Sequence, residues 1–431
     1  MEAKEPPPFC ADRFGASYLQ QLRDSATDYC TPESPGGLTC FHSETAPGRV
    51  DSFCFARGAL FDQVDNKFTL GCSLRDLDGL GVPKYNEFAN YWYDTGPGRV
   101  LEEAVKINQD NSSLEIPDNI PNYTLLVKRE GSGNIWHSLM EIFSMTLTID
   151  VLRMTQHPNE PTPLFTAADI ENTQVLVLDD STDGPYVDLW SLFAPKPLLR
   201  TNNPRLPLLN TSFENLIIPL SGGGNPLWQG DWDIHTCDDS PLLRTFSHRV
   251  LEHFHLDPDA PREEPPEIII TFINRTATRR LIDAEEYFAH LESEIPNVRV
   301  QSVDFAAISF AEQLAVAQQT DVLVGVHGAG LTHGMFLPLH SAMVEILPLD
   351  LNHKGFRNIA ALLGHAYFSA HASQSVLPLA PEVPGTSKTH DWHKEDIYIE
   401  KDKFMDLMNV AIKLFYNRGS RNYDVQRRVE G

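Results

Sequence analysis

Residues 320–348 place two histidines around a glycine-rich turn. The continuous apolar run DVLVGV leads into His327, and Gly328, Ala329 and Gly330 follow where the next helix is expected to begin. Small residues at the carboxyl end of a buried strand let backbone N–H groups approach a phosphate, and a helix N-terminus favours negative charge. The pattern predicts a ligand site that includes His327 and His333, with a tight turn between structural histidines as the alternative.

Three arginines lie within six positions at the end of an earlier apolar strand. They are Arg275, Arg279 and Arg280. A guanidinium group presents a rigid fork of donors that suits diphosphate oxygens. A solvated helix face pairing with nearby acids is the alternative, but the glycine turn favours phosphate contact. Glu345 lies inside another apolar strand, where a buried carboxylate needs a donor such as a ribose hydroxyl or an arginine.

A second pair of residues could act as an acid or base. His137 and Glu141 are four residues apart on a predicted helix, so they share one face. A carboxylate in this position can orient an imidazole as a general base, and an ordinary surface pair is the alternative. Asp179 and Asp180 follow another strand and resemble the aspartates that hold Mn²⁺ in some nucleotide-sugar enzymes. A capped turn explains them better, so we predict no metal site and no required cofactor.

Composition excludes several classes of protein. The 431 residues include 34 Lys and Arg against 59 Asp and Glu, a net charge of −25. Such a surface repels phosphate backbones and anionic lipids, so we expect neither nucleic acid nor a membrane surface as a partner. No apolar run approaches the roughly 20 residues that span a bilayer, and residues 135–152 are expected to form an amphipathic helix.

Cysteines and glycosylation sequons suggest an oxidising compartment. Five of the six cysteines lie between Cys10 and Cys72, the sixth is Cys237, and their spacing fits no zinc motif. The N-terminus has no signal peptide, so we expect a protein of the secretory lumen whose leader is absent from this chain, or a cytosolic protein if the sequence is complete. Four N-x-S/T sequons predict N-glycosylation at Asn111, Asn122, Asn210 and Asn274.

The chain alternates strands with helices and predicts an α/β protein. Regular alternation after residue 267 predicts right-handed βαβ units and a parallel, Rossmann-like sheet. A final helix over 403–416 is expected to pack back on the first domain. The predicted domains are a loop-rich, cysteine-rich cap (1–120), an α/β domain (121–256), a linker (257–266), a Rossmann-like domain (267–400) and a C-terminal helix and tail (401–431).

The run VGVHGAGLTHGMFLP, with the strand EILP, resembles the C-terminal domain of glycosyltransferase family 61. The likeness extends to CADRFGASYL, NIWHSLMEIF, CDDSPLLRTFSHRVLEHF and INRTATRRLIDAEEYFAHL, and so covers most of the chain. The resemblance implies a GT-B-like fold of two Rossmann-like domains facing a cleft, behind the cysteine-rich cap. It also implies an inverting enzyme that uses a UDP-sugar donor.

The resemblance assigns roles to the candidate residues. The domain over 267–400 would bind the donor, and the domain over 121–256 would bind the acceptor. His137 or Glu141 would supply base catalysis. The donor-binding residues would be Arg275, Arg279, His327, Gly328, Ala329, Gly330, Thr332, His333 and Glu345.

The substrate is open to several interpretations at this point. The leading one is transfer of N-acetylglucosamine from UDP to a Ser or Thr hydroxyl of a protein. Other family members transfer xylose or arabinose to glycans, which makes a pentose donor and a glycan acceptor the first alternative. A non-catalytic relative that binds a nucleotide sugar or a glycan is the second.

Overall fold

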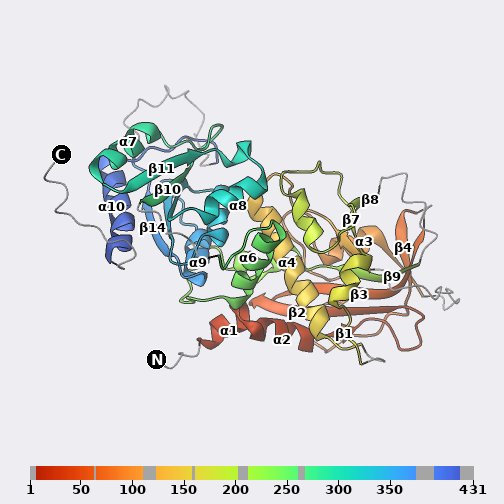
Figure 1. Cartoon of the computed structure of the whole chain (residues 1–431). Coiled ribbons are helices and arrows are strands. Elements are labelled where there is room, and N and C mark those ends of the chain that lie inside the picture. Colours follow the sequence, from red (N-terminus) through yellow and green to blue (C-terminus); the bar gives the residue numbers. More distant parts are fainter. Residues whose placement is uncertain are drawn as a thin grey trace, which may run out of the picture. The chain divides into compact units, whose positions relative to one another are not determined.

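The computed structural model describes residues 6–62, 65–109, 123–157, 161–201, 212–260, 267–374 and 393–417. The chain divides into two compact units (Figure 1). The first unit comprises Met1–Gly230 and Ser240–Phe246, and the second comprises Asp231–Asp239 and Ser247–Gly431. Helix α6 (Pro241–His253) contributes to both units.

The first unit is built on one nine-stranded sheet of mixed direction. Its strands follow the order β1-β2-β3-β9-β6-β7-β8, with β4 paired to β3 and β5 paired to β4. Strands β9, β6, β7 and β8 pair in parallel, whereas β1 to β4 pair antiparallel. The strands are β1 (Thr27–Asp28), β2 (Gly37–Ala46), β3 (Arg49–Asp62), β4 (Lys67–Gly71), β5 (Val105–Asn108), β6 (Tyr123–Val127), β7 (Thr173–Val177), β8 (Leu199–Arg200) and β9 (Ser212–Ile218).

The N-terminal cysteine-rich region belongs to this sheet, so the prediction of a loop-rich cap is wrong. Strands β2 and β3 are 10 and 14 residues long, and β3 pairs directly with β9. The predicted disulfides are confirmed, since no described cysteine is free. Cys40–Cys54 joins two residues that pair across β2 and β3, and Cys30–Cys72 ties the end of β4 to the segment after β1. Pro-Gly and Gly-Gly turns dominate the local sequence, but the aromatic residues Phe41, Phe53 and Phe55 between them are buried in the sheet.

Helix α4 (Ile135–Met154) is a core helix of the first unit. Among the described residues it is long and apolar enough to cross a bilayer, but 89% of its most apolar window is buried inside the protein. The prediction of an amphipathic helix is therefore wrong. Its buried hydroxyls are satisfied locally, because Thr148 donates to the backbone oxygen of Ser144 and Ser144 donates to that of Ser221. The remaining helices are α1 (Pro8–Phe14), α2 (Ala16–Asp24), α3 (Pro97–Ala104) and α5 (Pro226–Gln229), with short 3₁₀ turns η1 (Ala167–Asn172), η2 (Val187–Leu192) and η4 (Gly222–Gly224).

The second unit contains a five-stranded, entirely parallel sheet, which confirms the predicted alternation. Its strand order is β11-β10-β12-β13-β14, formed by β10 (Ile268–Ile273), β11 (Val298–Val303), β12 (Val322–Val326), β13 (Ala342–Leu347) and β14 (Ala366–His371). Between them lie α7 (Ala284–Glu294), η5 (Phe305–Ala307), α8 (Phe310–Gln318), η6 (Ala329–Phe336) and α9 (Gly355–Leu362).

The C-terminal helix α10 (Lys401–Asn417) covers this second sheet. Phe404, Met408 and Ile412 are buried in the same core as β10, β12 and β13, and the helix lies beside β14 (Figure 1). The prediction that this helix packs on the first domain is wrong. Its apolar residues follow helical spacing, which predicts a buried face but does not identify the sheet that the face covers.

The strand order of the second unit determines where a ligand can bind. The chain starts at β10, moves to β11 on one side and then crosses to β12 on the other side. In open parallel sheets a crevice forms outside the carboxyl ends of the strands at such a switch point. The residues that follow β10 and β12 are therefore those to inspect for a site.

Candidate functional site

The predicted arginines and the glycine turn meet at the switch point of the second unit. The Arg279 guanidinium donates through Nη1 to the backbone oxygen of His327, at 3.0 Å. A methyl group added at Gly328 would come within 2.7 Å of Arg275 Nη1 and 3.2 Å of Arg279 Nη1. Glycine therefore permits both guanidinium groups to lie against the backbone of the turn.

These two arginines are close in space and partly buried. Burial lowers the pKa of Arg275, and burial together with the Arg275 charge lowers the pKa of Arg279 to about 10. Both groups stay charged at neutral pH, so their proximity costs free energy unless a negative charge offsets it. Arg275 is held in place by its own loop, since Nε donates to the backbone oxygen of Thr278 at 2.9 Å.

Arg280 does not join this pair. Its guanidinium donates to both carboxylate oxygens of Asp396, and its side chain is 59% exposed. The structure thus separates the three arginines of the sequence motif into two that face the turn and one that forms a surface ion pair.

His327 and Glu345 form a buried chain with Tyr367. His327 Nδ1 lies 2.5 Å from Glu345 Oε1, and the Tyr367 hydroxyl donates to Glu345 Oε2. Glu345 is 1% exposed, and its two oxygens contact protein groups. The prediction from the sequence was a ribose or an arginine beside this carboxylate, and the observed partners are a histidine and a tyrosine. Glu345 fixes the orientation of the His327 ring at the carboxyl end of β12.

The remainder of the turn packs inward. His333 is buried, its Nδ1 lies 2.7 Å from the backbone oxygen of Gly330 and its Nε2 lies 2.8 Å from Gln313 Oε1. A methyl group at Gly330 would come within 2.9 Å of Ile273, and Thr332 is fully buried. Thr332 and His333 therefore pack into the fold, whereas Ala329 and Gly330 are only partly buried. A donor-binding role for these residues stays a prediction.

In the first unit, a different carboxylate from the predicted one lies beside His137. The Nδ1 atom of His137 lies 3.4 Å from Glu130 Oε2. Glu141, the predicted partner, instead accepts a hydrogen bond from the backbone N–H of Glu130, at 2.7 Å. Sequence spacing identified Glu141 because it shares a helix face with His137. It missed Glu130, which precedes the helix in a loop.

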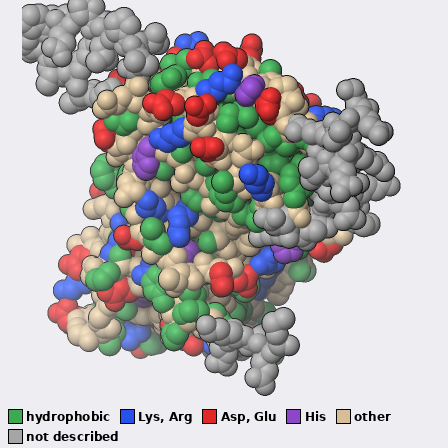
Figure 2. Space-filling view, turned by 90° about the vertical axis from the view of Figure 1, so that its left-hand side faces the viewer, with side chains coloured by type: hydrophobic (Ala, Val, Ile, Leu, Met, Phe, Trp, Pro, Cys, Tyr) green, Lys and Arg blue, Asp and Glu red, His purple; other side chains and the backbone are tan. Residues whose placement is uncertain are grey.

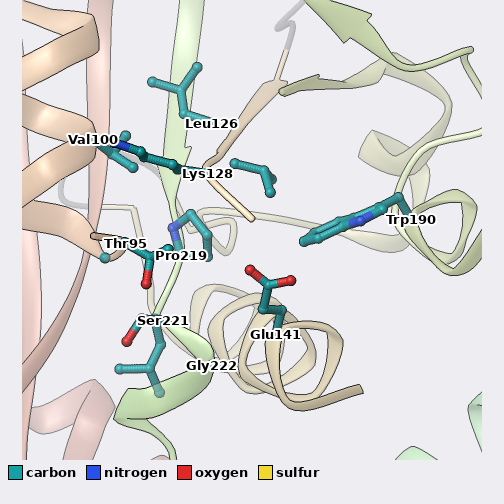
Figure 3. Close-up of a pocket in the computed structure, with 12 residues that line it drawn as sticks. Thr95, Val100, Leu126, Lys128, Glu141, Trp190, Pro219, Ser221 and Gly222 are labelled. Atoms are coloured by element: carbon teal, nitrogen blue, oxygen red, sulfur yellow. The ribbon is translucent and has the colours of Figure 1, made fainter. Parts of the chain in front are cut away.

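Glu141 is buried against a small cavity (Figure 3). Burial raises its pKa well above the usual value, and the charge of Glu130 raises it further. The cavity has a volume of about 20 Å³, which is enough for a single water molecule. Figure 3 shows the carboxylate pointing away from α4 toward Trp190 and Pro219. Glu141 therefore has the surroundings of a neutral carboxylic acid.

Asp179 is held in an ion pair with Arg129. The Arg129 guanidinium donates to both oxygens of Asp179, at 2.8 and 3.1 Å, and lowers the pKa of this carboxyl against the effect of burial. Among the residues that the structure describes, no group of three or more His, Cys, Asp or Glu could hold a metal ion.

Of the four predicted glycosylation sites, three lie outside the described residues: Asn111, Asn122 and Asn210. Asn274 is partly buried at the end of β10, directly before Arg275. Acidic and basic side chains are interspersed on the face shown in Figure 2.

Part of the sequence is similar to known glycosyltransferases. The sequence model of the Glycosyltransferase 61 family matches residues 135–344, which span α4 to the first half of β13. The chain is 26% identical over 403 residues to the EGF domain-specific O-linked N-acetylglucosamine transferase of Drosophila melanogaster, a match that covers 84% of this chain and 68% of the fly protein. The transferase of the same name from Mus musculus is 24% identical over 265 residues, which cover 59% of this chain and 46% of the mouse protein.

The matched region contains the histidine of α4, both arginines of the switch point and the glycine turn. The match ends one residue before Glu345, and it begins after Glu130. Residues 135–344 therefore carry the likeness to glycosyltransferase family 61 that the sequence predicts, and glycosyl transfer is the class of reaction that the comparisons support.

Proposed function

We propose that this protein is an inverting, GT-B-like glycosyltransferase that moves N-acetylglucosamine from UDP to a Ser or Thr hydroxyl of a protein. The observation that carries the proposal is the pair of guanidinium groups at the Gly328 turn, because two confined cations at a switch point suit a diphosphate. The names of the relatives support N-acetylglucosamine as the sugar and an EGF-like domain as the acceptor.

In this proposal the second unit binds the donor. Arg275 and Arg279 contact the diphosphate, and they offset the negative charge that develops as the bond between the sugar and UDP breaks. We propose that these fixed cations take the place of a metal ion. His327, whose ring is oriented by Glu345, forms part of the donor site beside the Gly328 turn.

The first unit supplies the base. His137 accepts the proton of the acceptor hydroxyl, and the oxygen attacks the anomeric carbon on the face opposite UDP, which inverts its configuration. We also propose that the protein acts in the secretory lumen, because its paired cysteines persist in an oxidising compartment.

A panel of donors tests this function. The purified protein is incubated with UDP-GlcNAc, UDP-xylose or UDP-arabinose, each with a folded EGF-like domain and EDTA, and the released UDP is measured. We expect acceptor-dependent release with UDP-GlcNAc alone. Release only with a pentose donor would contradict the sugar assignment. UDP binding without turnover on any acceptor would indicate a non-catalytic protein.

A further inference from the structure

We infer that Glu130, and not the helical neighbour Glu141, is the positioning residue of His137 in the reaction proposed above. The inference rests on that proposed function for the role of His137. Its structural basis lies entirely within the first unit, in the contacts of Glu130, His137 and Glu141.

Two buried polar atoms face each other without another partner. Glu130 Oε2 and His137 Nδ1 are both buried, and neither forms a hydrogen bond with any described residue. They lie 3.4 Å apart, and the Glu130 side chain is 1% exposed. A buried carboxylate oxygen without a donor is costly. A small rotation of either side chain would bring the imidazole N–H to this oxygen.

The other contacts of Glu130 fix its carboxylate in this direction. Its Oε1 atom accepts from the backbone N–H of Gly223 at 3.0 Å and from the Thr95 hydroxyl at 3.3 Å. Gly222 leaves room for the group, since a methyl there would come within 3.0 Å of Glu130 Oε1. The glycine turn η4 thus holds one oxygen of Glu130 and leaves the other for His137.

Glu141 is poorly placed to hold a negative charge beside His137. Glu141 is fully enclosed, and the charges of Glu130 and Asp179 raise its pKa in addition to burial, while the Arg129 charge opposes them. Glu141 Oε1 also accepts the backbone N–H of Glu130. Glu130 instead has one oxygen held by a backbone amide and a hydroxyl, and its other oxygen lies 3.4 Å from the imidazole, so Glu130 is the carboxyl group placed to orient His137.

Aromatic rings hold the imidazole from two sides. The His137 ring meets Tyr93 edge-on at 4.5 Å between centroids and Trp228 at 4.8 Å. With Nδ1–H donating to Glu130, the lone pair of Nε2 is free to take the proton of the acceptor hydroxyl. The positive charge that results on the ring is stabilised by Glu130, and no proton needs to leave the pair during the step.

The test compares Glu130→Gln with Glu141→Gln. In E130Q the amide oxygen keeps the bond to Gly223, so the amide NH₂ faces His137 Nδ1 and favours the tautomer with its proton on Nε2. That tautomer cannot act as a base. We expect kcat for transfer to fall by about 100-fold or more while KM for the UDP-sugar is unchanged, and the ¹⁵N NMR signals of His137 to show the proton moved from Nδ1 to Nε2.

The matched control is E141Q, because glutamine imitates the protonated acid. We expect it to retain most of the activity and the wild-type His137 tautomer. An unchanged tautomer in E130Q, or a larger loss of kcat in E141Q than in E130Q, would overturn the inference. If E130Q does not fold, Glu130→Asp shortens the side chain and should weaken the same NMR signature.

The two proposals can fail separately. A tautomer change in E130Q together with no transfer activity in the wild-type protein would leave the histidine–carboxylate pair standing and overturn the proposed function. Full transfer activity in E130Q would keep the proposed function and overturn the role of Glu130.

Discussion

The two candidate regions each bring two groups of the same kind together, acidic groups in the first unit and basic groups in the second. The first unit gathers two carboxylates, Glu130 and Glu141, and the pair can relieve its repulsion by keeping one proton. The second unit gathers two guanidinium groups, Arg275 and Arg279, which stay charged at neutral pH even though burial lowers their pKa. A carboxylate pair can therefore be stable without a ligand, whereas the two arginines keep their mutual repulsion, which the charge of Asp304 offsets at Arg275 and a bound anion would offset further.

Removing one arginine should produce the largest effect on donor binding. Arg275→Ala is expected to weaken UDP binding by about 100-fold, because charge-assisted hydrogen bonds contribute about 1.5–3 kcal/mol each. Isothermal titration calorimetry with UDP measures the change.

Arg280→Ala is the matched control, since it removes the same charge from the same segment. Arg280 pairs with Asp396 at the surface, so its loss should leave UDP affinity nearly unchanged. Equal losses of UDP affinity in both variants would mean that only the net charge of the segment matters. The surroundings of Arg275 and Arg280 would then make no difference to UDP binding.

The carboxylate region should show a smaller effect, on stability. Burial raises the pKa of Glu141 in the folded protein. Its contribution to the free energy of unfolding is therefore most favourable below a pH of about 4.5, where the group is protonated in both the folded and the unfolded protein. This contribution is lost as the pH rises toward the pKa of the folded state. Glutamine has no such dependence. We expect Glu141→Gln to raise the melting temperature by about 2 °C or more at pH 8 and by less at pH 5.

Differential scanning calorimetry at both pH values provides the measurement. The exposed Glu285→Gln in α7 is a suitable control for the loss of one surface charge. A difference between wild type and E141Q that stays constant from pH 5 to pH 8 would show that Glu141 is not protonated in the fold.

Sequence reasoning succeeded where chemistry and local pattern coincide. The strand ending at Val326 and the strand ending at Ile273 were recognisable as apolar runs, and parallel pairing brings their carboxyl ends together. The arginines and Gly328 were therefore predictable as a group. The pairing of Arg280 with Asp396 was not, because the partner lies 116 residues away in the sequence.

Prediction from the sequence failed for contacts that depend on how a loop folds back onto a helix. Glu130 precedes α4 in a segment without periodicity, so helical spacing pointed to Glu141 instead. The partners of the two His333 ring nitrogens, Gly330 and Gln313, were likewise not predictable, and a ligand role for His333 stays a prediction. The sequence did not predict the N-terminal strands, because the many turn residues between them suggested loops. These strands belong to the sheet that also contains β6 and β9.

The most direct test of the whole account follows the acceptor itself. Wild-type protein and His137→Gln are incubated with UDP-GlcNAc and a folded EGF-like domain, the mass of that domain is measured, and UDP affinity is determined for both proteins. The account predicts addition of one N-acetylglucosamine by the wild type, a loss of transfer of at least about 100-fold in H137Q, and equal UDP affinity. Equal transfer by both proteins would contradict it.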